Sequence, residues 1–315
     1  MEEVRLFMPV EVSLLMLKLK EIGLLFKNAA KELGKNKPII LASSTAFFTI
    51  FSIPPIIIIT VNALSLYFKS KSITQSFINN IQELFGEEAA RQMSNIASNF
   101  SSLASQPWIT IAGSVFLIFI ATNLFNIIKL SINQIWNIRV ESKSNILFHL
   151  KQRLIALGII VLTTVLFILS TVADSIIAFI RDFLPENFAE VNTLVVMVMS
   201  KIVVIIFIAL WFAAVYRFLP DARVAWKPIL TGAIVTSVLF VLGKYILERL
   251  LINSNIDNIF ETSTSIVLIM LFIFYASLIM YYGVSFTAVY SKFIEEEIEL
   301  RKNAERVEIK AIPKD

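Results

Sequence analysis

Residues 153–180 read RLIALGIIVLTTVLFILSTVADSIIAFI, and this stretch decides the fold class. After the opening Arg153, its only charged side chain is that of Asp174. A helix needs about 20 predominantly apolar residues to cross the roughly 30 Å hydrocarbon core of a bilayer. The stretch is long enough and apolar enough, so it predicts a membrane-spanning helix.

Five further runs of the same kind lie before and after it, at residues 38–66, 107–128, 192–216, 228–250 and 264–291. The composition agrees, because 57% of the residues are hydrophobic and only 17% are charged, whereas a soluble domain carries about a quarter charged residues. The sequence therefore predicts an all-α polytopic membrane protein with six transmembrane helices.

The basic residues predict the orientation of these spans. Lys and Arg outside the spans number 21 on the side of the two termini and five on the other side. Because cytoplasmic loops carry the excess of positive charge, both termini are expected in the cytoplasm of a bacterium, with the spans in its inner membrane. The expected organisation is a cytoplasmic N-terminal segment (1–37), a transmembrane domain (38–291) and a charged cytoplasmic tail (292–315).

Two regions outside the spans have the spacing of amphipathic helices. In the N-terminal segment, apolar residues recur at helical spacing, and they are Leu15, Leu19, Ile22, Phe26, Ala29 and Leu33. A second amphipathic region lies in the first outer loop, at about 70–105. Both are expected as interfacial helices that cap the bundle. The tail begins with Glu295, Glu296, Glu297 and Glu299, which are expected on a helical continuation of the last span.

Charged residues within the spans give the first candidate site, because burying a charge in the bilayer costs at least about 2.5–3.5 kcal/mol on insertion scales. They are Asp174, Lys201 and Lys244, with Glu248 one turn beyond Lys244. All four fall in the outer half of the bilayer in the predicted topology. One expectation is that these residues line a polar cavity open to the outer face. The alternative is that the two lysines extend to the membrane interface and that Lys244 pairs with Glu248.

A second polar set lies nearer the cytoplasm and comprises Ser43, Ser44, Asn123 and Asn126. Hydrogen bonding between helices is the usual role of such residues in lipid, and it is favoured here over a substrate site. Pro54 and Pro55 lie in the middle of the first span and are expected to kink it, because two N–H donors are lost there.

Several classes of chemistry are excluded or disfavoured by residue content. The chain has no cysteine and one histidine, His149, so no thiol nucleophile and no histidine-based metal cluster is expected. The formal charge of +4 is too small to argue for a nucleic-acid partner. No nucleophile–base pair is evident, so no enzyme activity, cofactor or metal is expected.

Four stretches together resemble a known family. They are 47–55 (FFTIFSIPP), 121–136 (ATNLFNIIKLSINQIW), 216–244 (YRFLPDARVAWKPILTGAIVTSVLFVLGK) and 277–290 (SLIMYYGVSFTAVY). Their order and spacing are similar to those of the YihY/virulence factor BrkB family of bacterial inner-membrane proteins, over roughly residues 20–293. The resemblance implies a six-span architecture. Some members of the family have carried a ribonuclease label, but the residues of this chain do not support ribonuclease activity.

The chain departs from the family pattern at two places. Members commonly have Gly-Ala-Glu in the last span, where this chain has Gly283-Val284-Ser285, so a carboxylate expected at Ser285 is missing. The outer loop before that span is often rich in Gly and Ala, whereas here it carries Asp257 and Glu261. A proton- or cation-coupled mechanism built on the missing carboxylate is therefore not expected.

The leading functional hypothesis is a transporter or lipid-handling protein of the cell envelope. Broken helices and intramembrane charges are what a path through the bilayer requires. Its expected partners are membrane lipids, with an anionic lipid or small molecule as substrate. The alternative is a non-transporting membrane scaffold for envelope-assembly partners, which would fail if residues 294–315 were removed. The sequence does not specify an oligomeric state.

Overall fold

The protein is described here by a computed structural model that covers residues 10–68, 91, 95, 107–140, 146–183, 189–252, 264–301 and 304–307. In these ranges the long helices are α1 (Val10–Lys35), α2 (Pro38–Phe68), α5 (Pro107–Ile135), α6 (Ile146–Phe183), α7 (Ala189–Phe218), α8 (Trp226–Ile252) and α10 (Thr264–Phe293). Four short strands lie between or after these helices, namely β1 (Ile138–Val140), β2 (Ala222–Arg223), β3 (Glu299–Leu300) and β4 (Ala304–Arg306). The predicted all-α class is confirmed. The outer-loop helices expected at about 70–105 lie outside the described residues, apart from positions 91 and 95.

Five described helices are long and apolar enough to cross a membrane. Their apolar windows are Ile118–Ile135, Leu150–Ser170, Val198–Phe218, Trp226–Leu247 and Ile269–Phe293. In α2 the described apolar stretch, Pro38–Ser52, is shorter than a span. The membrane-protein architecture is therefore confirmed, while a count of six spans stays a prediction.

The surfaces of α6 and α7 show what these helices face. Exposed apolar side chains follow one another at helical spacing along α6, at Leu154, Val161, Val165, Leu169, Val172 and Ile176. On α7 the exposed set is Val198, Ile202, Ile206 and Leu210. Aliphatic stripes of this length favour lipid over water as the surrounding solvent, because apolar surface is driven out of water.

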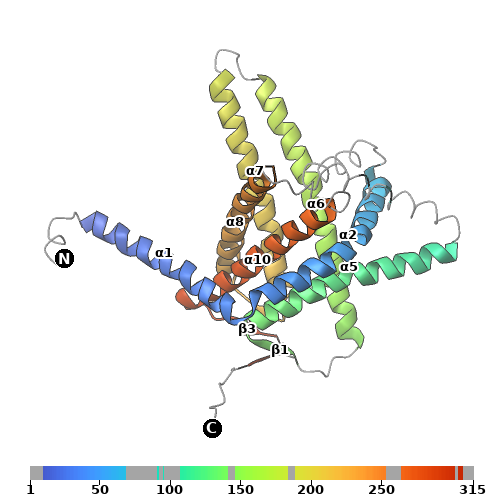
Figure 1. Cartoon of the computed structure of the whole chain (residues 1–315), viewed down its shortest axis with the longest axis horizontal. Coiled ribbons are helices and arrows are strands. Elements are labelled where there is room, and N and C mark those ends of the chain that lie inside the picture. The colour runs from blue at the N-terminus through green and yellow to red at the C-terminus, as the bar shows by residue number, and fades with distance from the viewer. Residues whose placement is uncertain are drawn as a thin grey trace, which may run out of the picture.

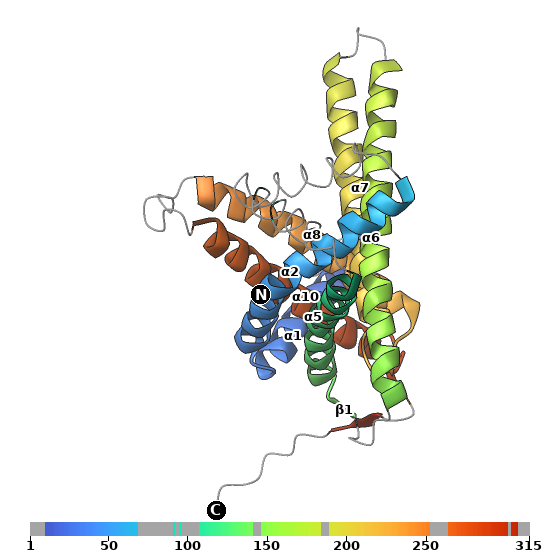
Figure 2. The same ribbon diagram turned by 90° about the vertical axis from the view of Figure 1, so that its right-hand side faces the viewer.

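Helix α10 lies at the centre of the assembly. It packs against α1, α2 and α8 and also contacts α5, whereas α7 packs between α6 and α8. Figure 2 shows that the pair α6–α7 and the pair α8–α10 diverge as they run away from the strands. The main buried core therefore lies toward the strand end, where it includes Ile132, Trp136, Val215 and Tyr281.

Helices α8 and α10 approach closely through two matched motifs, Gly232-x3-Thr236 and Gly283-x3-Thr287. A Cβ atom added at Gly232 would overlap the Oγ1 of Thr287, and one added at Gly283 would overlap the Oγ1 of Thr236. Each threonine hydroxyl donates to the carbonyl of the glycine four residues earlier in its own helix. Small residues at such crossings let helix backbones come together in lipid.

Aromatic side chains tie the helices together by donating to backbone carbonyls. The Tyr216 hydroxyl donates to the carbonyl of Met280 (2.8 Å), and the Trp136 Nε1 donates to that of Val284 (3.0 Å). In a similar way the Tyr282 hydroxyl of α10 donates to the carbonyl of Phe26 in α1 (3.0 Å). These bonds satisfy polar groups of side chains that are buried or partly buried between the helices.

The segment after α10 is not the helical continuation expected from its glutamates. Helix α10 ends at Phe293, and Glu295 adopts a positive φ of 59° that turns the chain back. The following residues pair antiparallel with two loops, since β3 lies beside β2 and β4 lies beside β1. The expectation failed because a run of glutamates is compatible with a helix but does not specify one, and pairing with the loops decides the outcome.

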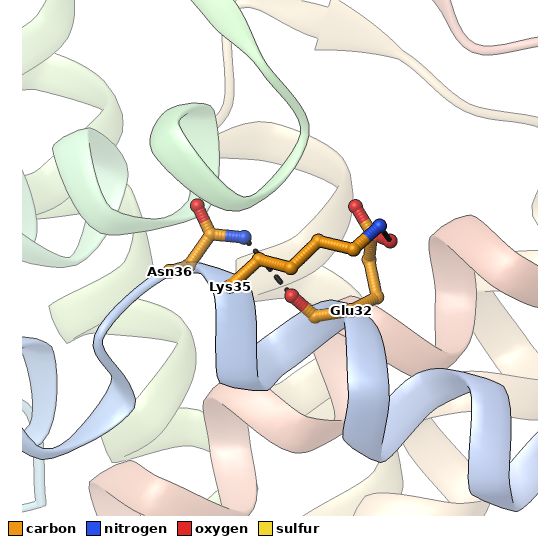
Figure 3. Close-up of polar contacts among 3 residues, drawn as sticks. All are labelled: Glu32, Lys35 and Asn36. Atoms are coloured by element: carbon orange, nitrogen blue, oxygen red, sulfur yellow. Dashed lines mark hydrogen bonds and ion pairs between the residues drawn. The ribbon is translucent and has the colours of Figure 1, made fainter. Parts of the chain in front are cut away.

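Helix α1 joins the bundle through its C-terminal half, and Figure 1 shows its N-terminal half reaching away from the other helices. Leu25 and Ala29 form a small buried cluster with Phe286 of α10, and Leu33 is buried in the main core. Ile22, which the predicted stripe included, is half exposed. At the end of α1, Lys35 pairs with Glu32 (2.6 Å) and the Asn36 Nδ2 donates to the Glu32 carbonyl (3.2 Å) (Figure 3).

We predict that Gly283→Ala destabilises the protein by about 1–3 kcal/mol, because the added methyl group overpacks the α8–α10 crossing. Gly158→Ala is the matched control, since nothing lies within 4 Å of a Cβ atom at that helical glycine. It should be neutral or stabilising by up to about 1 kcal/mol. The thermal midpoint of the detergent-solubilised protein, followed by circular dichroism, measures both. Equal effects of the two variants would contradict the close crossing.

Candidate binding cavity

A buried ion pair joins α5 to the turn after α7. The Lys129 Nζ lies 2.7 Å from the Asp221 Oδ2, and the two side chains are 8% and 6% exposed. Asn133, one turn after Lys129, donates its Nδ2 to the same Oδ2 (2.8 Å) and accepts the backbone N–H of Asp221 (3.0 Å). The carboxylate and its own peptide group are thus both bound to α5.

The sequence after α7 explains why Asp221 sits where it does. Pro220 disfavours the helical conformation of the residue before it and has no N–H of its own to donate. Helix α7 therefore ends at Phe218, and Leu219, Pro220 and Asp221 are all buried in the turn that follows. Charges removed from water in this way need close partners, because an unpaired buried charge is strongly destabilising.

Beside the ion pair lies a cavity of about 640 Å³. One side is the face of α5 that carries Phe119, Thr122, Asn123, Asn126 and Lys129. At about 1.5 Å per residue, this face extends about 15 Å along the helix axis. That is about half the thickness of a bilayer's hydrocarbon core.

The other walls of the cavity come from α6, the turn after α7, and the segment after α10. Half of the residues in these walls are charged, and with Lys129 the full charged set is Lys129, Lys151, Arg153, Asp221, Arg223, Glu299 and Arg301. Five of these are basic and two are acidic, which leaves a formal charge of +3. Such a cavity favours anions.

Two basic residues of the walls are held in place, Arg153 through its side chain and Arg301 through its backbone. The Arg153 guanidinium lies over the ring of Phe119, with its Cζ 4.4 Å from the ring centroid. The Arg301 backbone N–H donates to the carbonyl of Asp221 (3.1 Å), and the Ala304 N–H donates to that of Arg301 (2.9 Å). Asp221 therefore holds the segment after α10 against the cavity as well as binding α5.

The two described lysines of the predicted outer polar site, Lys201 and Lys244, do not line this cavity. The Lys201 Nζ of α7 lies over the Tyr245 ring of α8, 4.8 Å from its centroid, and this lysine is exposed. Lys244 is the residue before Tyr245 and is half-buried. Lys201 of α7 and Lys244 of α8 therefore lie at a similar height along the two neighbouring helices. The side chains of Asp174 and Glu248 lie outside the described residues.

The inner polar set divides in two. Asn123 and Asn126 both line the cavity, whereas Ser43 is exposed and Ser44 half-buried on α2, away from the cavity walls. Thr45, next to them, has its hydroxyl against that of Tyr281 on α10. Helix α2 runs on through Pro54 and Pro55, whose side chains lie outside the described residues, so the kink stays a prediction.

Sequence reasoning missed the role of Lys129, which it assigned to the loop after the second span. The helix instead continues to Ile135 and buries Lys129 inside it. The apolar residues Ile132 and Ile135, which follow Lys129 at helical spacing, were the signal for this continuation. Asp221, 92 positions later, offered no such local signal.

Metal binding has no support in the described part of the chain, where no three His, Cys, Asp or Glu side chains are grouped closely enough to hold an ion. The side chain of His149 lies outside the described residues, as do Asp257 and Glu261. Ser285, where family members commonly have a carboxylate, is fully buried, and its hydroxyl has no hydrogen-bond partner among the described residues.

Comparison with known proteins matches residues 29–308 to the virulence factor BrkB family. The chain belongs to this family. The match confirms the resemblance inferred from the four sequence stretches, two of which carry the cavity's ion pair, Lys129 in one and Asp221 in another. No solved structure matches the chain significantly.

Two curated relatives of the chain are known as UPF0761 membrane proteins. One, from Pelodictyon phaeoclathratiforme (strain DSM 5477 / BU-1), is 26% identical over 204 residues, which are 64% of this chain and 45% of the relative. The other, from Psychrobacter sp. (strain PRwf-1), is 25% identical over 280 residues, 87% of this chain and 49% of the relative. The chain thus spans about half the length of the curated relatives it matches.

We predict that Lys129→Met and Asp221→Asn each destabilise the protein by about 3–5 kcal/mol, because each leaves a buried group without its charged partner. The double variant should lose less than the sum of the two, as expected of residues in contact. Lys35→Met is the control, because it breaks an exposed pair that contributes at most about 1 kcal/mol. Thermal or denaturant unfolding in detergent measures all four. Additive losses would contradict the ion pair.

Proposed function

We propose that this chain is a multi-pass protein of the bacterial inner membrane, with both termini in the cytoplasm, that acts as a transporter or a lipid-handling protein of the cell envelope. The observation that carries the proposal is the cavity beside Lys129 and Asp221, which lies at the strand end of the helix assembly and is lined by an excess of positive charge. The proposed role is not enzymatic.

The proposed orientation is supported by the strands. β1 follows α5, β2 follows α7, and β3 and β4 follow α10, and their pairing gathers these three segments at one end of the bundle. These are the segments that the charge count assigns to the cytoplasmic side. Positive charge on that side also suits the anionic lipids of the cytoplasmic leaflet.

The proposed transport or lipid handling is supported by the shape and chemistry of the cavity. Its polar residues on α5 follow one helical face to a depth of about half a bilayer core. Polar side chains at such a depth are rare unless they line a path or pair with one another. Phe119, Phe125 and Ile155 supply apolar wall, as an amphipathic ligand such as a lipid requires.

The scaffold alternative needs a different test from removal of residues 294–315. Glu299, Leu300, Arg301 and Ala304 form part of the cavity wall, so their removal would damage a transporter as well as a scaffold. Substitutions that fill the cavity while leaving the surface after α10 intact separate the two functions.

We predict that the reconstituted protein moves fluorescent phosphatidylglycerol across vesicle membranes faster than protein-free vesicles do. Asn126→Trp, which places a large side chain in the cavity, should slow this movement about tenfold or more, because the indole occupies space that the lipid would need. Leu130→Trp is the matched control on the same helix, since Leu130 is exposed and does not line the cavity. A dithionite-quenching assay gives the rates.

The result of this assay distinguishes the transport hypothesis from the scaffold hypothesis. If the protein moves neither phosphatidylglycerol nor radiolabelled phosphate, the transport proposal is wrong and the scaffold hypothesis replaces it. Movement that Asn126→Trp and Leu130→Trp change equally would show that the path does not run through this cavity.

A further inference from the structure

We propose that the cavity binds a phosphate group between Arg153, Lys151 and Arg301, which deepens the proposed function and rests on it for its physiological role. The chemical class of ligand is a phosphate ester with an apolar portion. The group could arrive on a lipid headgroup or as a soluble phosphate, and the experiment below distinguishes these sources.

The first argument is the balance of charge that is left once the buried pair is set aside. Asp221 is bound by Lys129 and Asn133. Glu299 stands directly opposite Arg223 in the β2–β3 ladder, where side chains of paired residues point to the same face and opposite charges attract. Glu299 is then the only acidic side chain in the described lining to balance Lys151, Arg153, Arg223 and Arg301.

The second argument is the geometry of Arg153. Its Cζ lies over the Phe119 ring, 4.4 Å from the centroid, and this cation–π contact holds the guanidinium in the cavity wall. The N–H donors of a guanidinium form a planar fork that matches two oxygens of a phosphate. The contact with Phe119 therefore holds Arg153 beside the cavity through a ring instead of a carboxylate.

The third argument is the supply of further donors around the same space. The side-chain amides of Asn123, Asn126 and Gln152 line the cavity and can donate to phosphate oxygens. Arg301 is held in place through its backbone N–H, which donates to the Asp221 carbonyl, so its side chain is not needed for that bond. A tetrahedral anion with several acceptor oxygens fits this set better than a halide or a single carboxylate.

The size of the cavity indicates that the phosphate is part of a larger molecule. Its volume of about 640 Å³ falls within the range of sites for drug-sized ligands. Phe125, Ile155 and Leu219 line it as well, so an apolar portion attached to the phosphate has a place to bind. Phosphate esters that carry acyl or prenyl chains have both parts.

The test uses the full chain in nanodiscs of phosphatidylcholine, with fluorescent phosphatidic acid as the probe and inorganic phosphate as the competitor. Arg153→Gln combined with Arg301→Gln should weaken probe binding by about tenfold or more, because two charge-assisted hydrogen-bonding groups are lost. Lys227→Gln combined with Arg306→Gln is the matched control. Both control residues are exposed, lie toward the same end and do not line the cavity.

The outcomes decide both the site and its ligand. Phosphatidic acid binding that resists inorganic phosphate identifies a lipid headgroup, and binding that phosphate abolishes identifies a phosphate site open to soluble ions. Equal weakening in the two double variants, or no binding of either probe, overturns the proposal. If the arginine variant does not fold, Asn126→Trp tests the same cavity, and binding that it leaves unchanged also overturns the proposal.

Binding and transport can fail separately. Loss of phosphatidylglycerol movement with intact phosphatidic acid binding would remove the transport function and keep the site. Transport that continues at the wild-type rate in the arginine variant, whose probe binding is lost, would keep transport and show that this phosphate site is not on its path.

Discussion

The carboxylate of Asp221 is the group on which the strand end of the molecule depends. It binds Lys129 and Asn133 of α5, while the backbone carbonyl of the same residue accepts from Arg301 after α10. One residue thus connects three segments that are far apart in the sequence. Because desolvation makes an unpaired buried charge unfavourable, Lys129 and Asp221 are stable in this position only as a pair. Lys129, Asp221 and Arg301 all line the cavity, so these contacts also hold parts of its wall.

Farther into the bundle the helices are held by another kind of contact. Glycines and threonines of α8 and α10 face one another, and Tyr216 links Thr236 to the carbonyl of Met280. These are neutral groups bonded to backbone, which suits a region without water. The charged side chains that line the cavity gather at the strand end, whereas hydroxyl hydrogen bonds connect α7 to α8 and α10.

The fold class could be predicted because a span is a local property, readable from about 20 consecutive residues. The family could also be predicted, since its motifs lie in unbroken stretches. The cavity could not, because its walls come from α5, α6, the turn after α7 and the segment after α10. Lys129 was misassigned for a physical reason, since a lysine after an apolar run is the usual sign of a span's end. Its burial depends on Asp221, and no local pattern predicts that partner.

The separation of Lys129 and Asp221 also has a consequence for biosynthesis. The lysine enters the membrane 92 residues before its carboxylate is made. At about 5–20 residues per second, that interval is roughly 5–18 s. During it, α5 carries an uncompensated cation, which the insertion machinery or the lipid headgroups must accommodate. Arg301 is synthesised another 80 residues later. The order of translation therefore places completion of the cavity after the synthesis of α10.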